Sequence, residues 1–497
     1  MSPPTTARPV LASLVLALGA RRAAAQVFRF DDVDVPAPQT LQTHVMYYIR
    51  SLTGSGSQAR GKVTFDLTQV EGAGASQKYS GLQALVMSRS SFDTWAAKEA
   101  QCSTATSTGS ADKQGTPEAG TLLLDKIPGP PPVSYAIKGP KESTSLTVDL
   151  PQSKSEVYVL VFSNCGSVDH EGIKVVGTVS VRNAHGYLPA HDYPKRVFYA
   201  VMVVCYTVAS FVWAVAAIKW WSTLLYIQKG ILFVGILGLI ENLSFLILYE
   251  VWNQSGIYSV AISMVATLCY AWKLGVAFQV LLVQVVFDPA VGSAAEGEND
   301  TWANCKLSVA VALYMIAEFN AKVVQSYRLS RDLKLDTILL NYAPVVVMSL
   351  VLYAWANVAL ISTTAALKER GEKHASALFH SHVLVIISMI GGGLALAVEL
   401  FDPTSRDPDS WSLHWVWADG VRQIAFLVLF AGAQAVWFPS DETLGYTYQA
   451  AEGAQPEETI GAVLDGKWDD VDDPEEPEEG SSLQGARVVE PAVKAGE

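Results

Sequence analysis

Seven long apolar runs follow about 190 residues of mixed polarity and precede an acidic C-terminal segment. A helix needs about 20 apolar residues to cross a hydrocarbon core of about 30 Å. Because lipid cannot satisfy unpaired backbone groups, runs of this length are expected to be helices. A large soluble protein with buried helices is the alternative, which seven such runs within about 240 residues disfavour. The predicted spans are Val197–Ile218, Ile227–Tyr249, Ile257–Phe287, Leu307–Val324, Thr337–Thr363, Val383–Leu400 and Val416–Phe438.

The region before the first span has the pattern of β-structure. Val63–Val70 and Ser145–Leu150 alternate apolar and polar residues, and Glu156–Phe162 is more continuously apolar, as a central strand would be. Ile173–Val181 is a further apolar run, and stretches rich in Gly, Ser and Pro separate these segments. Short strands with such breaks predict a β-sandwich domain over residues 26–193.

The first 25 residues have the features of a secretory signal. Arg8 precedes the apolar stretch Val10–Ala20, and Ala23–Ala25 offers a cleavage site, although a cut after Ala20 or an uncleaved anchor is also compatible. A cleaved signal places the β-domain in the lumen, and seven crossings over residues 194–440 then place the C-terminus in the cytosol. Loop charges are nearly balanced between the two sides and do not decide the orientation.

The net charge of −13 belongs entirely to residues 441–497, which contain 16 acidic and 3 basic residues, while the rest of the chain has 32 of each. This segment has too few apolar residues to fold and is expected to be a disordered tail. Its acidic cluster is a candidate sorting signal for cytosolic coat or sorting proteins, with a purely solubilising extension as the alternative. The residues of this candidate signal are Trp468, Asp469, Asp470, Asp472 and Asp473. No basic surface indicates nucleic-acid binding.

Two cysteines fall in the predicted luminal domain. Cys102 and Cys165 are expected to form a disulfide that stabilises the domain by roughly 2–4 kcal/mol. Asn253 begins a sequon on the luminal side, close to the membrane, and is a candidate glycosylation site. No metal-ligand spacing, cofactor motif or catalytic arrangement is recognisable, so an enzyme is not expected.

Charged residues inside membrane spans are costly and suggest function. Glu318 and Lys322 are four residues apart and could pair along one helix, as could Asp419 and Arg422. Lys273 has no opposite charge three or four residues away. The functional interpretation is a polar cavity for a lipid headgroup, a peptide or ions, and the alternative is a set of salt bridges that fixes helix packing. The candidate residues are Glu241, Lys273, Glu318, Lys322, Asp419 and Arg422.

Three segments resemble the GOLD-domain seven-transmembrane family, also called lung seven-transmembrane receptors. GYLPAHDYP followed by FYAVM over 186–202 resembles the family's approach to its first span. The second span, with Ile227-Gln228 and Gly238–Glu241, and the seventh, with Trp417–Arg422 and Val436–Ser440, resemble the family's pattern too. The similarity covers about 185–445 and is greatest to the Golgi transmembrane branch. Asn242, Gly420 and Phe438 depart from it, where the family usually has charged residues.

The resemblance implies a GOLD-like β-sandwich over a seven-helix bundle, located in the Golgi membrane or in endosomes and acting in vesicle-mediated trafficking. The expected partners are membrane lipid, including a lipid in the bundle cavity, a luminal cargo or partner protein, and cytosolic sorting proteins. Some family members have been proposed as cation channels and some as receptors, so a channel or channel regulator and an orphan G-protein-coupled receptor are the alternatives. The rhodopsin-type motifs are missing from the ends of the third and seventh spans, which disfavours that receptor class.

Overall fold

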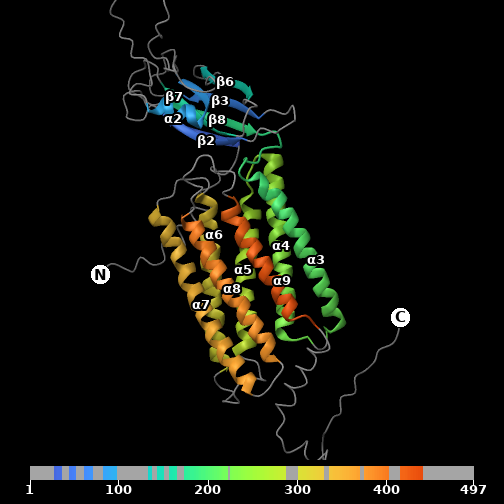
Figure 1. Ribbon diagram of the computed structural model, residues 1–497. Helices are drawn as coiled ribbons and strands as arrows, with labels where there is room; N and C mark the ends of the chain where they lie inside the picture. The colour runs from blue at the N-terminus through green and yellow to red at the C-terminus, as the bar shows by residue number, and fades with distance from the viewer. Residues whose placement is uncertain are drawn as a thin grey trace, which may run out of the picture.

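The computed structural model describes 27–35, 44–51, 61–70, 82–97, 133–136, 143–149, 156–164, 173–221, 224–286, 300–328, 335–369, 374–401 and 415–439. The predicted signal segment, the disulfide partners Cys102 and Cys165, and the acidic tail with Trp468 and its neighbours lie outside these residues. Within them, an N-terminal β-domain sits at one end of a helical bundle (Figure 1).

The β-domain is a sandwich of two antiparallel four-stranded sheets, as predicted. One sheet has the order β1-β8-β3-β6 and the other β2-β7-β4-β5. Of the eight strands among the described residues, the sequence pattern identified β3, β6, β7 and β8 and missed β1, β2, β4 and β5. It also missed the short helix α2 that follows β4. The bounds are β1 Val27–Val35, β2 His44–Ser51, β3 Lys62–Val70, β4 Leu82–Ser88, α2 Arg89–Ala96, β5 Val133–Ala136, β6 Ser143–Asp149, β7 Glu156–Asn164 and β8 Ile173–Arg182.

Strand β7 is apolar over its central residues 157–162 because both of its faces are covered. It lies between β2 and β4 in its sheet. On one face, Val159 and Val161 pack with Phe92 and Trp95 of α2. The residues between them, such as Leu160, point to the opposite face and are buried as well. The prediction of a central strand at this position is confirmed.

Seven apolar helical segments form the bundle, and they agree with the seven predicted spans. Six of them, within the described residues, are long and apolar enough to cross a membrane, and the seventh is shorter. The last segment begins with a π-helical turn, η6, that runs directly into α9. The bounds are α3 Tyr193–Lys219, α4 Tyr226–Ser255, α5 Val260–Val286, α6 Asp300–Arg328, α7 Leu335–Glu369, α8 His374–Phe401, η6 Val416–Gly420 and α9 Val421–Val436.

Each helix packs against the next along the chain, and α9 closes the bundle by contacting α3 and α4. Glycines let the helices approach closely, as is common in membrane bundles. A Cβ at Gly238 of α4 would lie 2.3 Å from the ring of Tyr206 on α3, and one at Gly275 of α5 would lie 2.3 Å from Met315 on α6. The outward sides of the helices carry many exposed apolar side chains, as expected of a surface in contact with lipid.

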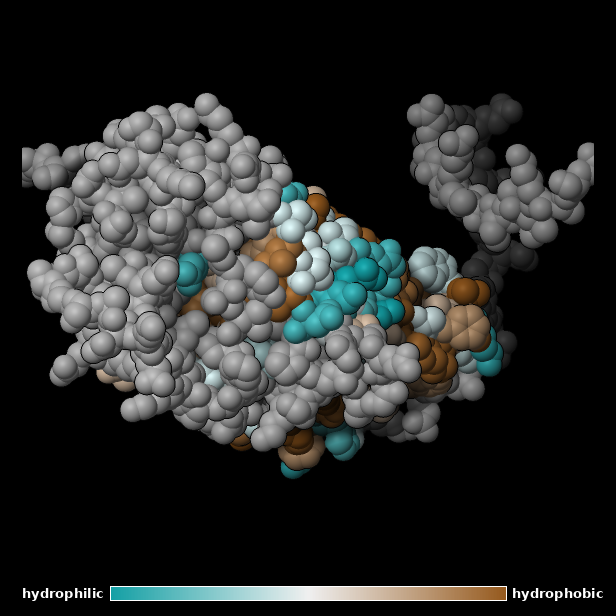
Figure 2. Space-filling model, turned by 90° about the horizontal axis from the view of Figure 1, so that it is seen from above, coloured by the Kyte–Doolittle hydropathy of each residue, from teal (hydrophilic) through white to brown (hydrophobic). Residues whose placement is uncertain are grey.

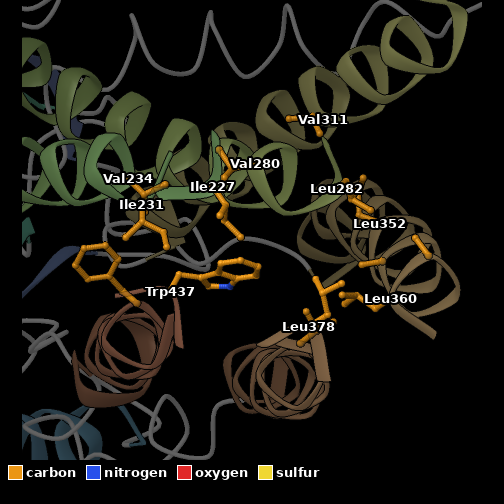
Figure 3. Close-up of a cluster of buried hydrophobic side chains, with 14 of the residues drawn as sticks. Ile227, Ile231, Val234, Val280, Leu282, Val311, Leu352, Leu360, Leu378 and Trp437 are labelled. Carbon is orange, nitrogen blue, oxygen red and sulfur yellow. The ribbon is translucent and has the colours of Figure 1, made fainter. Parts of the chain in front are cut away.

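The half of the bundle away from the sandwich has an apolar core. Each helix from α3 to α9 contributes buried side chains to it, and part of this cluster is drawn in Figure 3. Trp437, just after α9, closes this core: its indole N–H donates to Ser381 Oγ at 2.9 Å and its carbonyl accepts from Gln228 Nε2 at 3.2 Å. The labelled members are Ile227, Ile231, Val234, Val280, Leu282, Val311, Leu352, Leu360, Leu378 and Trp437.

A connector over 183–192 joins the sandwich to α3 and is docked on the end of α4. Asn253 of α4 holds it through three hydrogen bonds. The Asn253 carbonyl accepts from the Tyr187 N–H at 2.8 Å, its Oδ1 accepts from the Leu188 N–H at 3.2 Å, and its Nδ2 donates to the His185 carbonyl at 2.9 Å. Leu188 is fully buried among aromatic side chains of α3 and α4.

The use of Asn253 as a glycosylation site stays a prediction, and these contacts weigh against it. Its side chain is buried, and the amide nitrogen that would carry the glycan donates to the connector. In this fold Asn253 is a docking residue for the connector.

Gly186 allows this docking and gives a direct test of it. Its φ is +136°, and a Cβ would lie 2.3 Å from Asn253 Oδ1. We expect Gly186→Ala to lower the stability of the folded protein by about 1–3 kcal/mol, measured by thermal unfolding in detergent, because the strained backbone and the clash both act against docking.

The matched control is Gly393→Ala in α8, where a Cβ would meet nothing within 4 Å. An alanine there should leave the melting temperature unchanged or slightly raised, since alanine favours helix more than glycine does. Equal melting temperatures for the two variants would show that the connector is not held as described.

Candidate functional site

The charged residues of the spans meet in one network in the half of the bundle nearest the sandwich. Its first level joins the connector to three helical segments. Lys195 Nζ of α3 lies 3.0 Å from Asp192 Oδ1 in the connector and 2.8 Å from Asp419 Oδ2 in η6. The other oxygen of Asp419 is in an ion pair with Lys322 of α6. All four side chains are buried.

Local sequence explains how these residues are positioned. Asp192 is the N-cap residue of α3, and Pro194 in the first turn has the backbone angle that starts a helix. Lys195 follows Asp192 by three residues and therefore reaches back to it. The π-helical turn of η6 inserts an extra residue into the last helix, and such turns are common at functional sites. Asp419 lies within this turn.

Burial and neighbouring positive charges shift the pKa of Asp192 in opposite directions. Burial disfavours its charged form, but His191 and Lys195 outweigh burial and hold the pKa of Asp192 below its ordinary value. His191 Nε2 lies 3.1 Å from Asp192 Oδ2. The connector therefore presents an ionised carboxylate to Lys195.

The second level pairs Arg422 of α9 with Glu318 of α6. The guanidinium Nη1 lies 3.6 Å from Glu318 Oε2 and donates to the Tyr270 hydroxyl of α5 at 2.9 Å. The Tyr314 hydroxyl donates to Glu318 Oε1 at 3.0 Å. The Tyr270 ring also lies 5.4 Å from Lys322 Nζ, which connects this level with the first.

The third level lies deepest in the bundle and pairs Lys273 of α5 with Glu241 of α4. Lys273 Nζ is 2.6 Å from Glu241 Oε2, and neither side chain has exposed surface. Gln423 of α9 joins both, because its Oε1 accepts from Lys273 at 3.2 Å and its Nε2 donates to Glu241 Oε1. Lys273 Nζ also lies 4.4 Å from the centre of the Phe426 ring.

Apart from His191, whose charge depends on protonation, the charges of the network balance, and the network ends within the bundle. It contains four carboxylates and four basic groups: Asp192, Glu241, Glu318 and Asp419 with Lys195, Lys273, Lys322 and Arg422. Glu241 lies 14 residues before the end of α4, which places it about 21 Å below the sandwich end at 1.5 Å per residue. The apolar core occupies the bundle beyond it (Figure 3).

This arrangement can lock helices together and can transmit a displacement from the connector to α6 and α9. Each cation faces a carboxylate on another segment, so moving one segment would break a buried pair, which is costly. Among the described residues, no group of three or more His, Cys, Asp or Glu side chains could hold a metal ion. The network is buried, so the hydrophilic patch seen beside hydrophobic side chains from the sandwich end belongs to the outer surface (Figure 2).

The structure brings together all six residues singled out from the sequence, but it corrects how they pair. The ion pairs expected along single helices, Glu318 with Lys322 and Asp419 with Arg422, are exchanged between helices: Lys322 contacts Asp419 and Arg422 contacts Glu318. Lys273, which has no partner in its own helix, is paired with Glu241 on the neighbouring one. This geometry corresponds to the salt-bridge alternative, and a cavity that holds lipid stays a prediction.

Sequence reasoning missed several members of the network. Lys195 and Asp192 looked like ordinary charges of a loop, although the Asp-Tyr-Pro-Lys order was a signal of a helix start with an internal ion pair. Gln423 and Tyr270 are uncharged, so a search for membrane-buried charge could not find them. Their roles depend on which helices are neighbours.

Comparison with known proteins covers this same region. Residues 194–444 match the family model described as GOST, seven transmembrane domain. The chain is similar to Transmembrane protein 87A of Xenopus tropicalis, with 24% identity over 274 residues, or 54% of this chain and 49% of that protein. It is similar to human Transmembrane protein 87A at 22% identity over 288 residues, covering 56% and 49%. For mouse Transmembrane protein 87B the identity is 31% over 96 residues, covering 19% and 17%. The chain thus spans about half the length of the 87A relatives it matches.

Proposed function

Because the chain belongs to the GOST seven-transmembrane family, we propose that it is a non-enzymatic Golgi membrane protein acting in vesicle-mediated trafficking, within the Golgi or between endosomes and the Golgi. Its sandwich faces the lumen and binds a cargo or partner protein. Its C-terminal tail faces the cytosol and binds sorting or coat proteins.

The observation that supports this proposal most directly is the position of Lys195. This residue bonds to Asp192 in the segment that carries the sandwich and to Asp419 at the start of the last helix. The last helix is the one that leads to the tail. These buried contacts connect the sandwich to the last helix. A protein bound to the sandwich therefore acts through them on the helix that precedes the cytosolic tail.

Localisation combined with proximity labelling tests this function. The full-length protein is tagged on the tail with a labelling enzyme and expressed in cells. Co-localisation with Golgi markers and labelling of coat or sorting proteins are expected. Residence at the cell surface with labelling of G proteins would overturn the proposal in favour of a receptor.

The tail makes a separate prediction. Deletion of residues 465–480 removes Trp468 and the acidic cluster. We expect the variant to fold and insert normally but to shift away from the Golgi at steady state, because acidic strips dock on basic grooves of partner proteins. Imaging of the tagged variant measures the shift. A variant with the same residues in scrambled order keeps the charge of the segment. It therefore separates a specific signal, which scrambling destroys, from a solubilising extension, which scrambling preserves. An unchanged location after deletion would exclude the signal.

A cation channel or channel regulator is the second candidate, favoured by the carboxylates Glu241, Glu318 and Asp419 in the spans. Against it, each is paired with a basic side chain, and the apolar core lies beyond the network. Conduction requires a polar path through the whole bundle. Purified protein in liposomes should therefore give no cation flux above protein-free vesicles. Flux that Glu241→Gln abolishes would support the channel.

A further inference from the structure

Several buried polar atoms on the seam between α3 and α4 lack a hydrogen-bond partner within the described part of the chain, Ser210 Oγ among them, and three others are considered together. They are the hydroxyls of Tyr199 and Tyr206 on α3 and the side-chain oxygen of Asn242 on α4. All three side chains are buried, with 0% of their surface exposed. Buried polar atoms of this kind cost free energy unless they are hydrogen-bonded, and in native structures nearly all are.

Packing places Asn242 between the two tyrosines. The Tyr206 ring lies against Gly238, four residues before Asn242, so the two α4 residues share one face. The Tyr199 ring stacks on Phe245, three residues after Asn242, with ring centres 4.9 Å apart. Consecutive helices in the bundle run in opposite directions, so Tyr206, Asn242 and Tyr199 follow one another along the seam.

Each of the three side chains is held in place by other contacts. Asn242 Nδ2 donates to the Gly238 carbonyl, which leaves Oδ1 on the far side of the amide as a free acceptor. The Tyr206 ring stacks on Phe430 with centres 5.6 Å apart, and the Tyr199 ring also stacks on Tyr249 at 5.6 Å. The side chains therefore cannot easily turn to bond to one another.

We propose that the α3–α4 seam is a binding site for ordered water, which bridges the hydroxyls of Tyr199 and Tyr206 and the amide oxygen of Asn242. A buried water typically makes about three hydrogen bonds to groups that otherwise lack partners. Tyrosine hydroxyls donate and accept, and the amide oxygen accepts, so this set matches what water offers.

The chemistry of the seam favours water over a cation or a lipid chain. Lys273 Nζ lies 5.6 Å from the centre of the Tyr206 ring and already pairs with Glu241, so a metal cation beside it would be repelled. An acyl chain would leave the three polar atoms without partners. Water carries no net charge and therefore preserves the neutrality of the ion-pair network.

Hydroxyl-radical labelling by X-ray radiolysis tests the site on the purified full-length protein in nanodiscs. Radicals formed from bound water modify nearby side chains, even deep in a membrane protein, and mass spectrometry measures the rate at each residue. We expect Tyr199 and Tyr206 to be modified at least several-fold faster than Tyr342 of α7, which is also buried but packs in a separate apolar cluster between α6 and α7. Rates equal to that of Tyr342 would overturn the proposal.

Removal of one hydroxyl supplies a second measurement. Tyr206→Phe should lower the melting temperature and slow the labelling of Tyr199, because the bridging water loses one of its partners. The matched control Tyr314→Phe removes a hydroxyl bonded directly to Glu318, so it should lower the melting temperature without changing the labelling of Tyr199. If the seam is dry, Tyr206→Phe removes an unsatisfied group, and an unchanged or raised melting temperature would contradict the site.

Discussion

Lys273→Met is expected to destabilise the bundle by about 3–5 kcal/mol, enough to retain the protein in the endoplasmic reticulum. The methionine fills a similar volume but leaves Glu241 buried and unpaired, and an uncompensated buried charge carries this cost. Thermal unfolding of the purified protein and the fraction that leaves the endoplasmic reticulum measure the effect.

Two further variants separate charge from shape. Lys219→Met changes an exposed lysine at the far end of α3 and should leave both measurements unchanged. The double variant Glu241→Met with Lys273→Met removes the whole pair and should recover most of the stability, because replacing a buried ion pair by apolar residues is often neutral. If Lys273→Met folds as well as the unchanged protein, the ion pair does not stabilise the bundle.

Asp419→Asn is expected to have the second largest effect, a loss of about 3 kcal/mol or more. The substitution preserves the shape of the side chain but removes the negative charge shared by Lys195 and Lys322, so the network acquires a net positive charge inside the membrane. Thermal unfolding measures the loss, and limited proteolysis of the sandwich tests whether the connector is released at the same time.

Asp93→Asn is the control for this substitution. Asp93 pairs with Arg89 on the exposed face of α2, where 53% of its side chain is accessible, so the loss should be at most about 1 kcal/mol. Similar losses for both substitutions would show that Asp419 has no special role. A large loss for Asp419→Asn without release of the connector would restrict its role to the packing of the bundle.

The architecture was largely predictable because it follows from local patterns. An apolar run longer than the hydrocarbon thickness can form only a helix in lipid, which is why all seven segments were located correctly. Alternation with period two identified β3 and β6 in the same way. Strands β1, β2 and β4, the short strand β5 and the helix α2 were missed because they are brief or lack a clear period, and the strands' positions depend on pairing with distant strands.

The candidate site could be predicted only as a set of residues. Charge inside a span identified Glu241, Lys273, Glu318, Lys322, Asp419 and Arg422 without reference to their neighbours. Spacing along one helix then gave the wrong partners, because a buried side chain pairs with whatever faces it across the helix interface. Lys322 and Glu318 of α6 therefore pair with Asp419 of η6 and Arg422 of α9, because the folded bundle brings these segments together.

The sequence by itself determined the class of the protein, the order of its parts and the membrane-buried charges, since each depends on residues close together in the chain. Only the tertiary structure decided that Lys195 joins the connector to the last helix, that Asn253 holds the connector, and that the network ends at an apolar core. These features require contacts between residues up to more than 200 positions apart, and no local pattern specifies which helix faces which. The physical reason is that the low dielectric of the membrane demands a partner for every buried charge, while helix packing alone selects that partner.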